Sequence, residues 1–376
     1  MRRSYKYRLY PNRSQARSLD AVLSQHRRLY NLALRERRDT YETEARSVSY
    51  GEQSGRFKES RRVSRGFASL NFSSAQATLR RQDRAFAAFS PRVRSGEAPG
   101  YPRFKSEDRF RTVEFPSYGD GCRLKKSERL YLQNIGHIKV KLHRPVEGTI
   151  KTVSVKRACG KWYVIFSCEL GDAPEATGGG PAVGIDLGLK SFLVTSDDES
   201  VEPPRHYRKA QKKLRRAQRS VSRKQKSSHR RRKARAKVAR LHEKTANQRR
   251  DFHHKQARKL VDGHGLIAHE ALNVKGIART RLAKSTHDAG WTQFLQILSY
   301  KAEDAGTRVV AVDPRNTTQA CSACGAMPEV KKTLSDRMHI CPCGYIADRD
   351  ANAARNILSL GWSDQDGTWR TGACVS

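Results

Sequence analysis

The chain has 376 residues, a length that predicts two or three domains. Lys and Arg number 75 against 37 Asp and Glu, and the net charge of +38 indicates a polyanionic partner, with nucleic acid favoured over a membrane surface. Apolar runs stay short of the roughly 20 residues that a membrane-spanning helix needs, and the start of the sequence lacks the apolar segment of a secretory signal. These features exclude a membrane-spanning helix, and we expect a cytoplasmic protein with no membrane partner.

Two helices are predicted near the start of the chain. Apolar stripes among arginines predict them over residues 14–46 and 73–89. The polar segment 51–66 is expected to be a loop, and Gly and Pro mark another loop over 96–105.

Strands are predicted on both sides of this helical region. Alternating apolar residues predict a strand over residues 4–10. Between residues 112 and 170, β-rich runs alternate with hairpin turns, which favours a small barrel or sandwich that the first strand could complete. Four tyrosines could stack on bases, but packing within the fold is favoured. They are Tyr5, Tyr7, Tyr10 and Tyr30.

The C-terminal half is expected to alternate strands and helices after a linker that contains the run TGGGP (177–181). The predicted strands are 182–187, 191–195, 266–270 and 308–312, and the predicted helices are 285–304 and 350–360.

The most basic part of the chain lies between these elements. Residues 205–259 contain 24 Lys and Arg against two acidic residues, a charge of +22. Their spacing predicts helices with a turn near Ser227 and Ser228, which could follow a nucleic-acid backbone through phosphate contacts. The alternative is a charged face that is merely solvated. The residues expected to bind nucleic acid are Lys212, Lys213, Arg215, Arg216, Arg219, Arg223, Lys224, Arg230 and Arg231.

Three acidic residues are the candidate catalytic groups. Asp186 and Glu270 end or interrupt apolar β-like runs, and Asp350 opens a helical run. This order suits an RNase H-like layout, in which strand ends and one helix start present carboxylates at one edge. Three carboxylates can hold two divalent ions roughly 3.5–4 Å apart and hydrolyse a phosphodiester, and oxygen ligands favour Mg²⁺ or Mn²⁺. Taken singly, each acid could be a surface or capping residue, Asp350 at the start of its helix included.

Four clustered cysteines predict a structural zinc site. They form the pairs Cys321 with Cys324 and Cys341 with Cys343, each followed by a glycine that permits a tight turn. Four thiolates suit closed tetrahedral coordination of Zn²⁺. The second pair is one residue shorter than the first, and His339 could replace one thiolate.

Eight short runs closely resemble the TnpB (OrfB) family of insertion-sequence-encoded, RNA-guided DNA nucleases, relatives of the type V CRISPR effectors. They are YRLYPN (7–12), RLYN (28–31), DRAF (83–86), GYPRFK (100–105), GIDLG (184–188), EALNVK (270–275), NTTQACSACG (316–325) and DRDANAA (348–354).

The resemblance implies a multidomain α+β fold. The expected parts are a wedge-like β-barrel (1–12 and 110–172), an inserted helical recognition lobe (13–109), a linker (173–181), an RNase H-like RuvC nuclease domain (182–315 and 346–362) with basic helices (205–260) and an inserted zinc ribbon (316–345), and a flexible tail (363–376).

The resemblance also implies a function. Asp186, Glu270 and Asp350 would bind the catalytic metal, the family motif favouring Asp350 over the nearby Asp348. A guide RNA would select double-stranded target DNA by base pairing next to a short target-adjacent motif, with one protein for each guide. Gln76 falls where the family's motif-recognising helix lies.

Two departures from the family pattern concern these same motifs. Ala271 stands where many members have Asp, and the Cys-Pro-Cys pair shortens the ribbon by one residue. The alternatives to a guided nuclease are a transposase-like strand-transfer protein and a guided DNA-binding repressor that does not cut.

Overall fold

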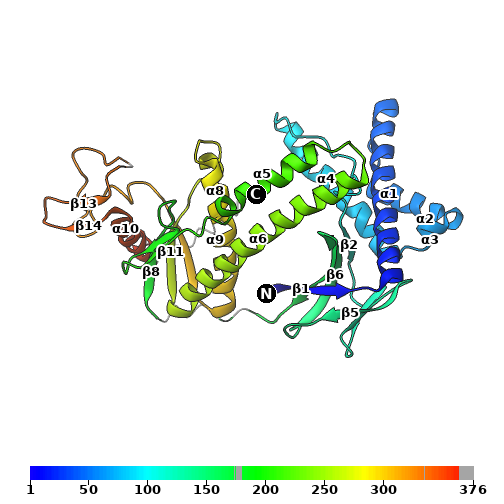
Figure 1. The fold of residues 1–376 in the computed structure, drawn as a ribbon, viewed down its shortest axis with the longest axis horizontal. Coiled ribbons are helices and arrows are strands. Elements are labelled where there is room, and N and C mark those ends of the chain that lie inside the picture. Colours follow the sequence, from blue (N-terminus) through cyan, green and yellow to red (C-terminus); the bar gives the residue numbers. More distant parts are fainter. Residues whose placement is uncertain (173, 175–179, 334, 364–376) are drawn as a thin grey trace. The chain divides into compact units, whose positions relative to one another are not determined.

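The computed structural model describes residues 1–172, 174, 180–333 and 335–363, and it divides the chain into two compact units, Met1–Asp172 and Ala173–Ser376 (Figure 1). Most of the expected linker and the expected tail beyond residue 363 lie outside the described residues.

Across residues 1–172, all of them described, seven antiparallel strands form one sheet with the order β2-β6-β7-β1-β5-β4-β3. The strands are β1 (Arg2–Tyr10), β2 (Thr112–Phe115), β3 (Cys122–Lys125), β4 (Arg129–Leu132), β5 (Gly136–Lys141), β6 (Thr149–Ala158) and β7 (Lys161–Glu169). The strand expected over 4–10 is confirmed. It lies in the middle of the sheet, between two strands that are more than a hundred residues away in sequence.

The expected wedge-like β-barrel is present in part, as a single curled sheet that stays open. Its edge strands β2 and β3 do not pair with each other within the described residues of unit 1. The physical reason is that helix side chains, among them Leu19, Leu23 and Leu34, pack into the same core as the strands and fill the space that closure would need.

The alternation of side chains between the two faces of β1 explains which of its tyrosines are buried. Tyr5 and Tyr7 point into this core and are 1% and 0% exposed, and Tyr30 joins them from the first helix. Packing is therefore confirmed for these three, whereas Tyr10 is exposed and lies near the guanidinium of Arg8.

The helices of unit 1 are α1 (Arg13–Glu44), α2 (Tyr50–Val63), α3 (Arg65–Ala68) and α4 (Phe72–Arg94). The loop expected over 51–66 is wrong, since α2 occupies most of it. Ser49 and Glu52 form a capping box that starts α2, and the buried ring of Phe57 anchors it. The other buried side chain of α2 is polar, since Gln53 hydrogen-bonds to Arg37, Ala33 and Glu36 of α1, so the helix has little apolar periodicity for a sequence to reveal. The loop expected over 96–105 is confirmed over residues that are all described.

In the described part of unit 2, a second sheet has the order β10-β9-β8-β11-β12, in which β8, β11 and β12 are parallel. Its strands are β8 (Ala182–Asp186), β9 (Leu193–Thr195), β10 (Ser200–Val201), β11 (Leu266–Glu270) and β12 (Arg308–Val312), and β13 (Met338–Ile340) and β14 (Ile346–Asp348) form a separate hairpin.

The helices of unit 2 are α5 (His206–Ser222), α6 (His229–Gly263), α7 (Val274–Ile277), α8 (Ala283–Ala289), α9 (Trp291–Ala305) and α10 (Arg349–Ser363). The single helix expected over 285–304 is interrupted at Gly290, whose positive φ of 68° ends α8. Over the described ranges, the helices are all too short or too polar to cross a membrane.

The sheet of unit 2 lies between helices on both faces (Figure 1). Val183, Ile185 and Ile267 pack in one core with α6 and α9, whereas Ala268 packs with Ile357 of α10 on the other face. Successive residues of a strand face opposite sides of the sheet. Residues 184 and 268, two positions before Asp186 and Glu270, therefore lie on the same face as these acids, the face that α10 covers.

Gly184 permits the close approach of α10 to β8. A Cβ atom built at Gly184 would lie 2.0 Å from the carbonyl oxygen of Ala354 and 2.7 Å from the backbone nitrogen of Leu358. Since both are backbone atoms of a packed helix, no side-chain rotation can relieve this contact.

We predict that Gly184→Ala lowers the free energy of unfolding by about 2–3 kcal/mol or more, the cost typical of overpacking in a core. Thermal unfolding followed by circular dichroism measures the loss. Gly55→Ala is the matched control, because its Cβ meets nothing within 4 Å on α2 and alanine favours a helix. Equal melting temperatures for the two variants would contradict the packing argument.

Candidate active site and zinc centre

Asp186 and Glu270 end adjacent parallel strands. The pairing of Ile185 with His269 brings the two acids to the same level at the carboxyl edge of the sheet. Asp350 stands in the first turn of α10, which crosses this face. The structure thus has the three acids at the positions expected from the sequence, two at strand ends and one at a helix start.

The three carboxylates interact electrostatically. Burial, together with the negative charges of Glu270 and Asp350, raises the pKa of Asp186 to about 7, against the opposing charge of Arg349. Burial also raises the pKa of Glu270, against a hydrogen bond that its carboxylate accepts from the hydroxyl of Thr317. Carboxylates that disfavour one another's charge need a cation to be ionised together.

The structure separates the roles of the two acids at the start of α10. Asp348 is exposed and caps the helix, since its Oδ1 accepts from the backbone N–H of Asp350 at 2.8 Å. The side chain of Asp350 is 15% exposed and lies beside Arg349 and Asp186. Capping therefore belongs to Asp348, and Asp350 is available to join the other two acids.

The chemistry of this cluster fits hard divalent cations. Its donors are carboxylate oxygens, which suit Mg²⁺ or Mn²⁺. Among the described residues, the four cysteines form a group whose potential ligand atoms all lie within 4.8 Å of one another, and the three acids do not form such a group.

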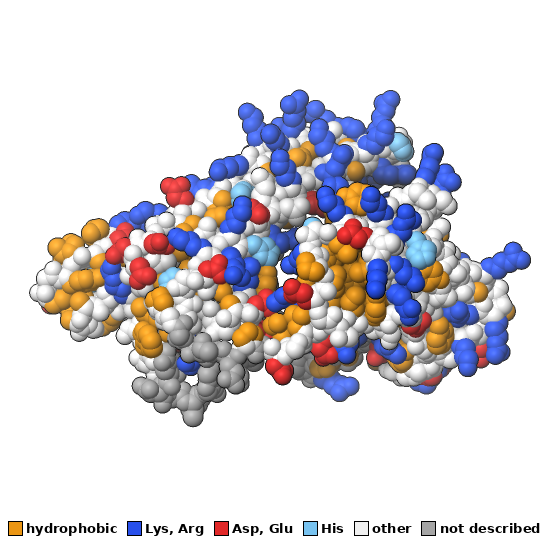
Figure 2. Space-filling view, turned by 90° about the horizontal axis from the view of Figure 1, so that it is seen from below, with side chains coloured by type: hydrophobic (Ala, Val, Ile, Leu, Met, Phe, Trp, Pro, Cys, Tyr) orange, Lys and Arg blue, Asp and Glu red, His pale blue; other side chains and the backbone are white. Residues whose placement is uncertain are grey.

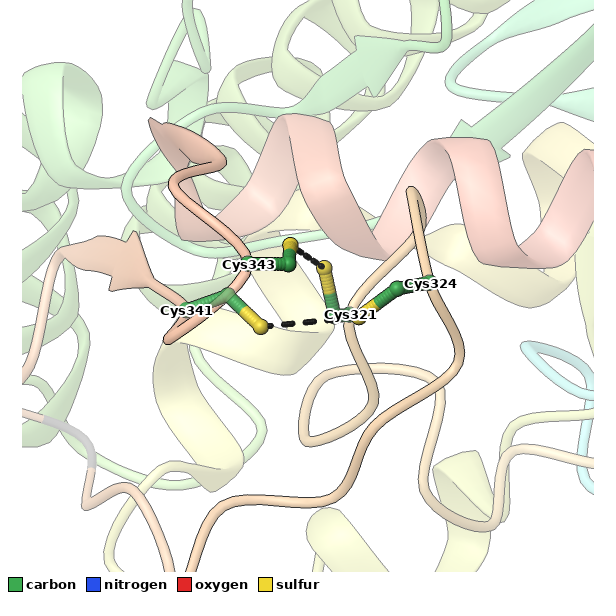
Figure 3. A group of neighbouring side chains, drawn as sticks. All are labelled: Cys321, Cys324, Cys341 and Cys343. Atoms are coloured by element: carbon green, nitrogen blue, oxygen red, sulfur yellow. Dashed lines mark hydrogen bonds between the residues drawn. The ribbon is translucent and has the colours of Figure 1, made fainter.

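The four expected zinc ligands come together (Figure 3). The sulfur atoms of Cys321 and Cys343 are 3.9 Å apart, and those of Cys324 and Cys341 are 3.6 Å apart. Zinc–sulfur bonds of about 2.3 Å in a tetrahedron require sulfur–sulfur distances of about 3.8 Å. The arrangement therefore fits a closed Zn²⁺ site.

Each cysteine pair forms a tight turn that ends at a glycine with positive φ, 74° at Gly325 and 88° at Gly344. The N–H of Gly325 donates to the carbonyl of Cys321, four residues back, and that of Gly344 to Cys341, three residues back. The turn around the Cys-Pro-Cys pair is thus one residue shorter, and it still places both sulfur atoms in the cluster.

His339 lies beside the cysteines and outside the group of four. Its ring is 2% exposed. Burial opposes ionisation of Cys321, but the backbone N–H of Cys324 and the ring of His339 outweigh it and lower its pKa to about 6. We assign His339 to the support of a thiolate and not to metal coordination.

The basic segment folds into two long helices, α5 and α6, that lie side by side (Figure 1). The expected turn is confirmed, with Ser228 capping α6. Of the nine proposed nucleic-acid contacts, all of them described, seven are exposed. The other two hold the turn: Lys224 donates to Ser220, and Arg231 donates to the carbonyl of Lys224.

Basic side chains also outnumber acidic ones on the face of the molecule in Figure 2. The start of α5 is held by Asp288 of α8, whose carboxylate accepts from the backbone N–H groups of Tyr207 and Arg208 at 2.8 and 3.1 Å. A carboxylate at a helix N-terminus stabilises it and fixes its direction.

Gln76 is half-buried on α4, and its side chain donates to the hydroxyl of Ser54 on α2 at 3.2 Å. This contact gives it a structural role between two helices. Its role in motif recognition stays a prediction.

Comparison with known proteins identifies the family. A protein of Streptomyces pristinaespiralis named "Putative RNA-guided DNA endonuclease" is 36% identical over 372 residues, which cover 96% of this chain and 90% of that protein. The chain belongs to the TnpB (OrfB) family. An Escherichia coli K12 relative, "Putative RNA-guided DNA endonuclease InsQ", is 29% identical, with 95% of this chain and 92% of that protein covered.

Family profiles match three parts of this TnpB-family chain. "Probable transposase" matches residues 165–281, "Cas12f1-like, TNB domain" matches 291–357, and "Helix-turn-helix domain" matches 1–46. The last description does not fit the structure, in which residues 1–46, all described, contain one strand and one uninterrupted helix. Among solved structures, "Structure of the mini-RNA-guided endonuclease CRISPR-Cas_phi3" aligns with a TM-score of 0.49 and 10% identity, covering 96% of this chain and 92% of that chain.

Sequence reasoning assigned no role to several residues that the structure places at these sites. Thr317, Arg349 and Asn352 all lie inside the runs that carry the family resemblance, so the motifs contained them. Asp288 lies outside those runs, and a single acid in a polar stretch gives no signal that it caps a helix 80 residues away.

We predict one zinc ion per purified chain and its loss, with a lowered melting temperature, in the double variant Cys321→Ser with Cys324→Ser. The reason is that a structural site contributes its binding free energy to folding. Elemental analysis and thermal unfolding measure the two effects, with Cys159→Ser as a control outside the cluster. The zinc site would be refuted if the wild-type protein contained no zinc and had the same melting temperature as the double variant.

We predict that, in protein free of divalent cations at the carboxylates, the contribution of Asp186 to the free energy of unfolding falls as the pH rises from 5 to 8. The pKa of Asp186 in the folded state, about 7, lies above its usual value of 3.8, so the folded state binds the extra proton and this stabilising contribution is lost as the pH rises through 7. The Asp186→Asn variant has no carboxyl group at this position and so lacks this loss. The unfolding free energy of the variant minus that of the wild type should therefore increase by about 1–4 kcal/mol between pH 5 and 8, at about 1.4 kcal/mol per pKa unit. An advantage independent of pH would count against the prediction.

Proposed function

We propose that this chain is an RNA-guided, metal-dependent DNA endonuclease associated with a transposable element. The observation that carries the proposal is the meeting of three acids from distant parts of the sequence at one sheet edge, in a family whose relatives are named for this activity. In this proposal unit 2 is an RNase H-like RuvC nuclease domain with residues 316–345 as a zinc ribbon, and the open sheet of unit 1 is the wedge.

In the proposed mechanism, Asp186, Glu270 and Asp350 hold two Mg²⁺ or Mn²⁺ ions. Bound there, the ions would lower the pKa of the attacking water and stabilise the leaving oxygen. Thr317 holds one oxygen of Glu270 in place by a hydrogen bond. Arg349, 8% exposed, places a positive charge beside Asp350 at 3.5 Å and offsets part of the repulsion among the acids.

The exposed basic residues of α5 and α6 are proposed to bind the sugar-phosphate backbone of the guide RNA or of the target DNA. Phosphate contacts fix position and carry no sequence information. Selection of the target therefore comes from base pairing with the guide, and recognition of the target-adjacent motif is assigned to Gln76. One protein for each guide RNA stays part of the proposal.

The two alternatives differ in what they require of the acids. A guided repressor needs no carboxylate cluster, whereas all three acids are present here, and the charges of Glu270 and Asp350 act on Asp186. A strand-transferring transposase would use the same acids but would need no guide. The decisive test therefore varies both the acid and the RNA.

We predict that Asp186→Ala lowers the rate of target cleavage by more than about 100-fold, since loss of a mere outer-shell partner of a metal ligand costs 10–100-fold. The protein is expressed with the DNA that flanks its gene, the copurifying RNA is sequenced, and cleavage of a matched double-stranded target is measured with Mg²⁺. Binding of the RNA should persist in the variant, because the basic helices are unchanged.

Asp348→Ser is the matched control, because serine also caps a helix and the change leaves the three acids in place. It should cut at close to the wild-type rate. Full cleavage by Asp186→Ala would overturn the assignment of the acids. DNA strand joining without RNA would favour the transposase, and guided binding without cleavage by the wild type would favour the repressor.

A further inference from the structure

The backbone on both sides of a zinc ligand is fixed to α10. Asn352 is fully buried, and its side-chain amide hydrogen-bonds to the residues on either side of Cys321, both within the segment 317–322. Its Oδ1 accepts from the backbone N–H of Ser322 at 2.9 Å, and its Nδ2 donates to the carbonyl of Ala320 at 2.8 Å. An amide that satisfies both a donor and an acceptor of one loop fixes the loop's distance and its orientation.

A second asparagine extends this contact along the helix. The Nδ2 of Asn356 donates to the carbonyls of Ala320 and Thr317, both at 2.8 Å. Asn352 and Asn356 are four residues apart and so share one face of α10. Asp350 precedes Asn352 by two residues on the same helix, so a displacement of the segment would be passed to the third carboxylate.

The same segment contacts the second carboxylate directly. Thr317 is 2% exposed, and its hydroxyl donates to Oε1 of Glu270, which is 8% exposed. A hydrogen bond to a charged, largely buried group is among the stronger ones, and its loss leaves that group unsatisfied. The segment thus holds Glu270 at one end and the zinc ligand Cys321 at the other.

Zinc would change how firmly this segment is held. Four zinc–sulfur bonds join Cys321 to three other ligands when the metal is bound, whereas thiols at the same distances make weak hydrogen bonds. Cys324 and Cys343 are exposed, so a chelator can reach the site from solvent. Removal of the metal therefore releases a loop that two of the three acids depend on.

We propose that the zinc ribbon positions the catalytic carboxylates: Thr317 and Asn352 are positioning residues that transmit zinc binding at Cys321 to Glu270 and Asp350. This inference rests on the proposed function to the extent that the three carboxylates bind divalent metal.

The test measures Mn²⁺ binding to the full chain, with Mn²⁺ as the probe and the free ion counted by electron paramagnetic resonance. Zinc-loaded protein is compared with protein from which a chelator has removed zinc before dialysis. We expect the dissociation constant for Mn²⁺ to rise by about tenfold or more without zinc, within the range for outer-shell partners of metal ligands. Metal content by elemental analysis verifies both samples.

Two variants test the individual residues in zinc-loaded protein. Asn352→Ala should weaken Mn²⁺ binding about tenfold while one zinc per chain is retained. Thr317→Val keeps the size of the side chain and removes its hydroxyl, so it should weaken Mn²⁺ binding with zinc again retained, and Thr317→Ser should restore it. Ser359→Ala, on the exposed face of α10, is the matched control and should bind Mn²⁺ as the wild type does.

Unchanged Mn²⁺ affinity in zinc-free protein and in Thr317→Val would overturn the inference, provided that Asp186→Ala abolishes Mn²⁺ binding. The Thr317 pair keeps the test decisive if Asn352→Ala fails to fold. If Asp186→Ala binds Mn²⁺ as tightly as the wild type, the proposed metal site itself is wrong and this inference falls with it, so the two failures are distinguishable.

Discussion

Helix α10 lies directly on β8, with the carbonyl of Ala354 where a side chain of residue 184 would be. This contact brings the start of the helix to the strand-end acids, which parallel pairing has already placed side by side. Chain segments at least 80 residues apart supply the three carboxylates. Their proximity therefore depends on backbone packing that a single methyl group would disturb.

The cluster that this packing creates opposes the stability of the fold. Two of its acids have raised pKa values, because burial disfavours the ionised forms of both Asp186 and Glu270 and like charges add to this effect at Asp186. Arg349 and Thr317 offset part of this effect without cancelling it. Cations that complete the site would offset this cost, since an ion that binds the folded state alone stabilises it.

Strongly patterned elements of this chain were predictable from sequence. The strand ends at Asp186 and Glu270, the basic helices and the cysteine pairs follow from periodicity and spacing, and the structure contains them. Helix α2 was missed because it buries one aromatic ring and the polar side chain of Gln53, which leave no apolar stripe in the sequence. The open sheet was missed because strand patterns do not tell whether a helix fills the space that closure needs. Thr317 and Asn352 stood inside recognised motifs, but their partners are set by tertiary contact.

The central place of β1 has a consequence for synthesis on the ribosome. Its partners β5 and β7 end at Lys141 and Glu169, so β1 has both hydrogen-bonding edges open while the next 130 or so residues are made. Helices α1–α4 are translated in this interval and have mostly local contacts, so they can form first. Arg2, Lys6 and Arg8, on the face of β1 opposite its buried tyrosines, then protect the unpaired strand, because like charges discourage pairing with a second nascent chain.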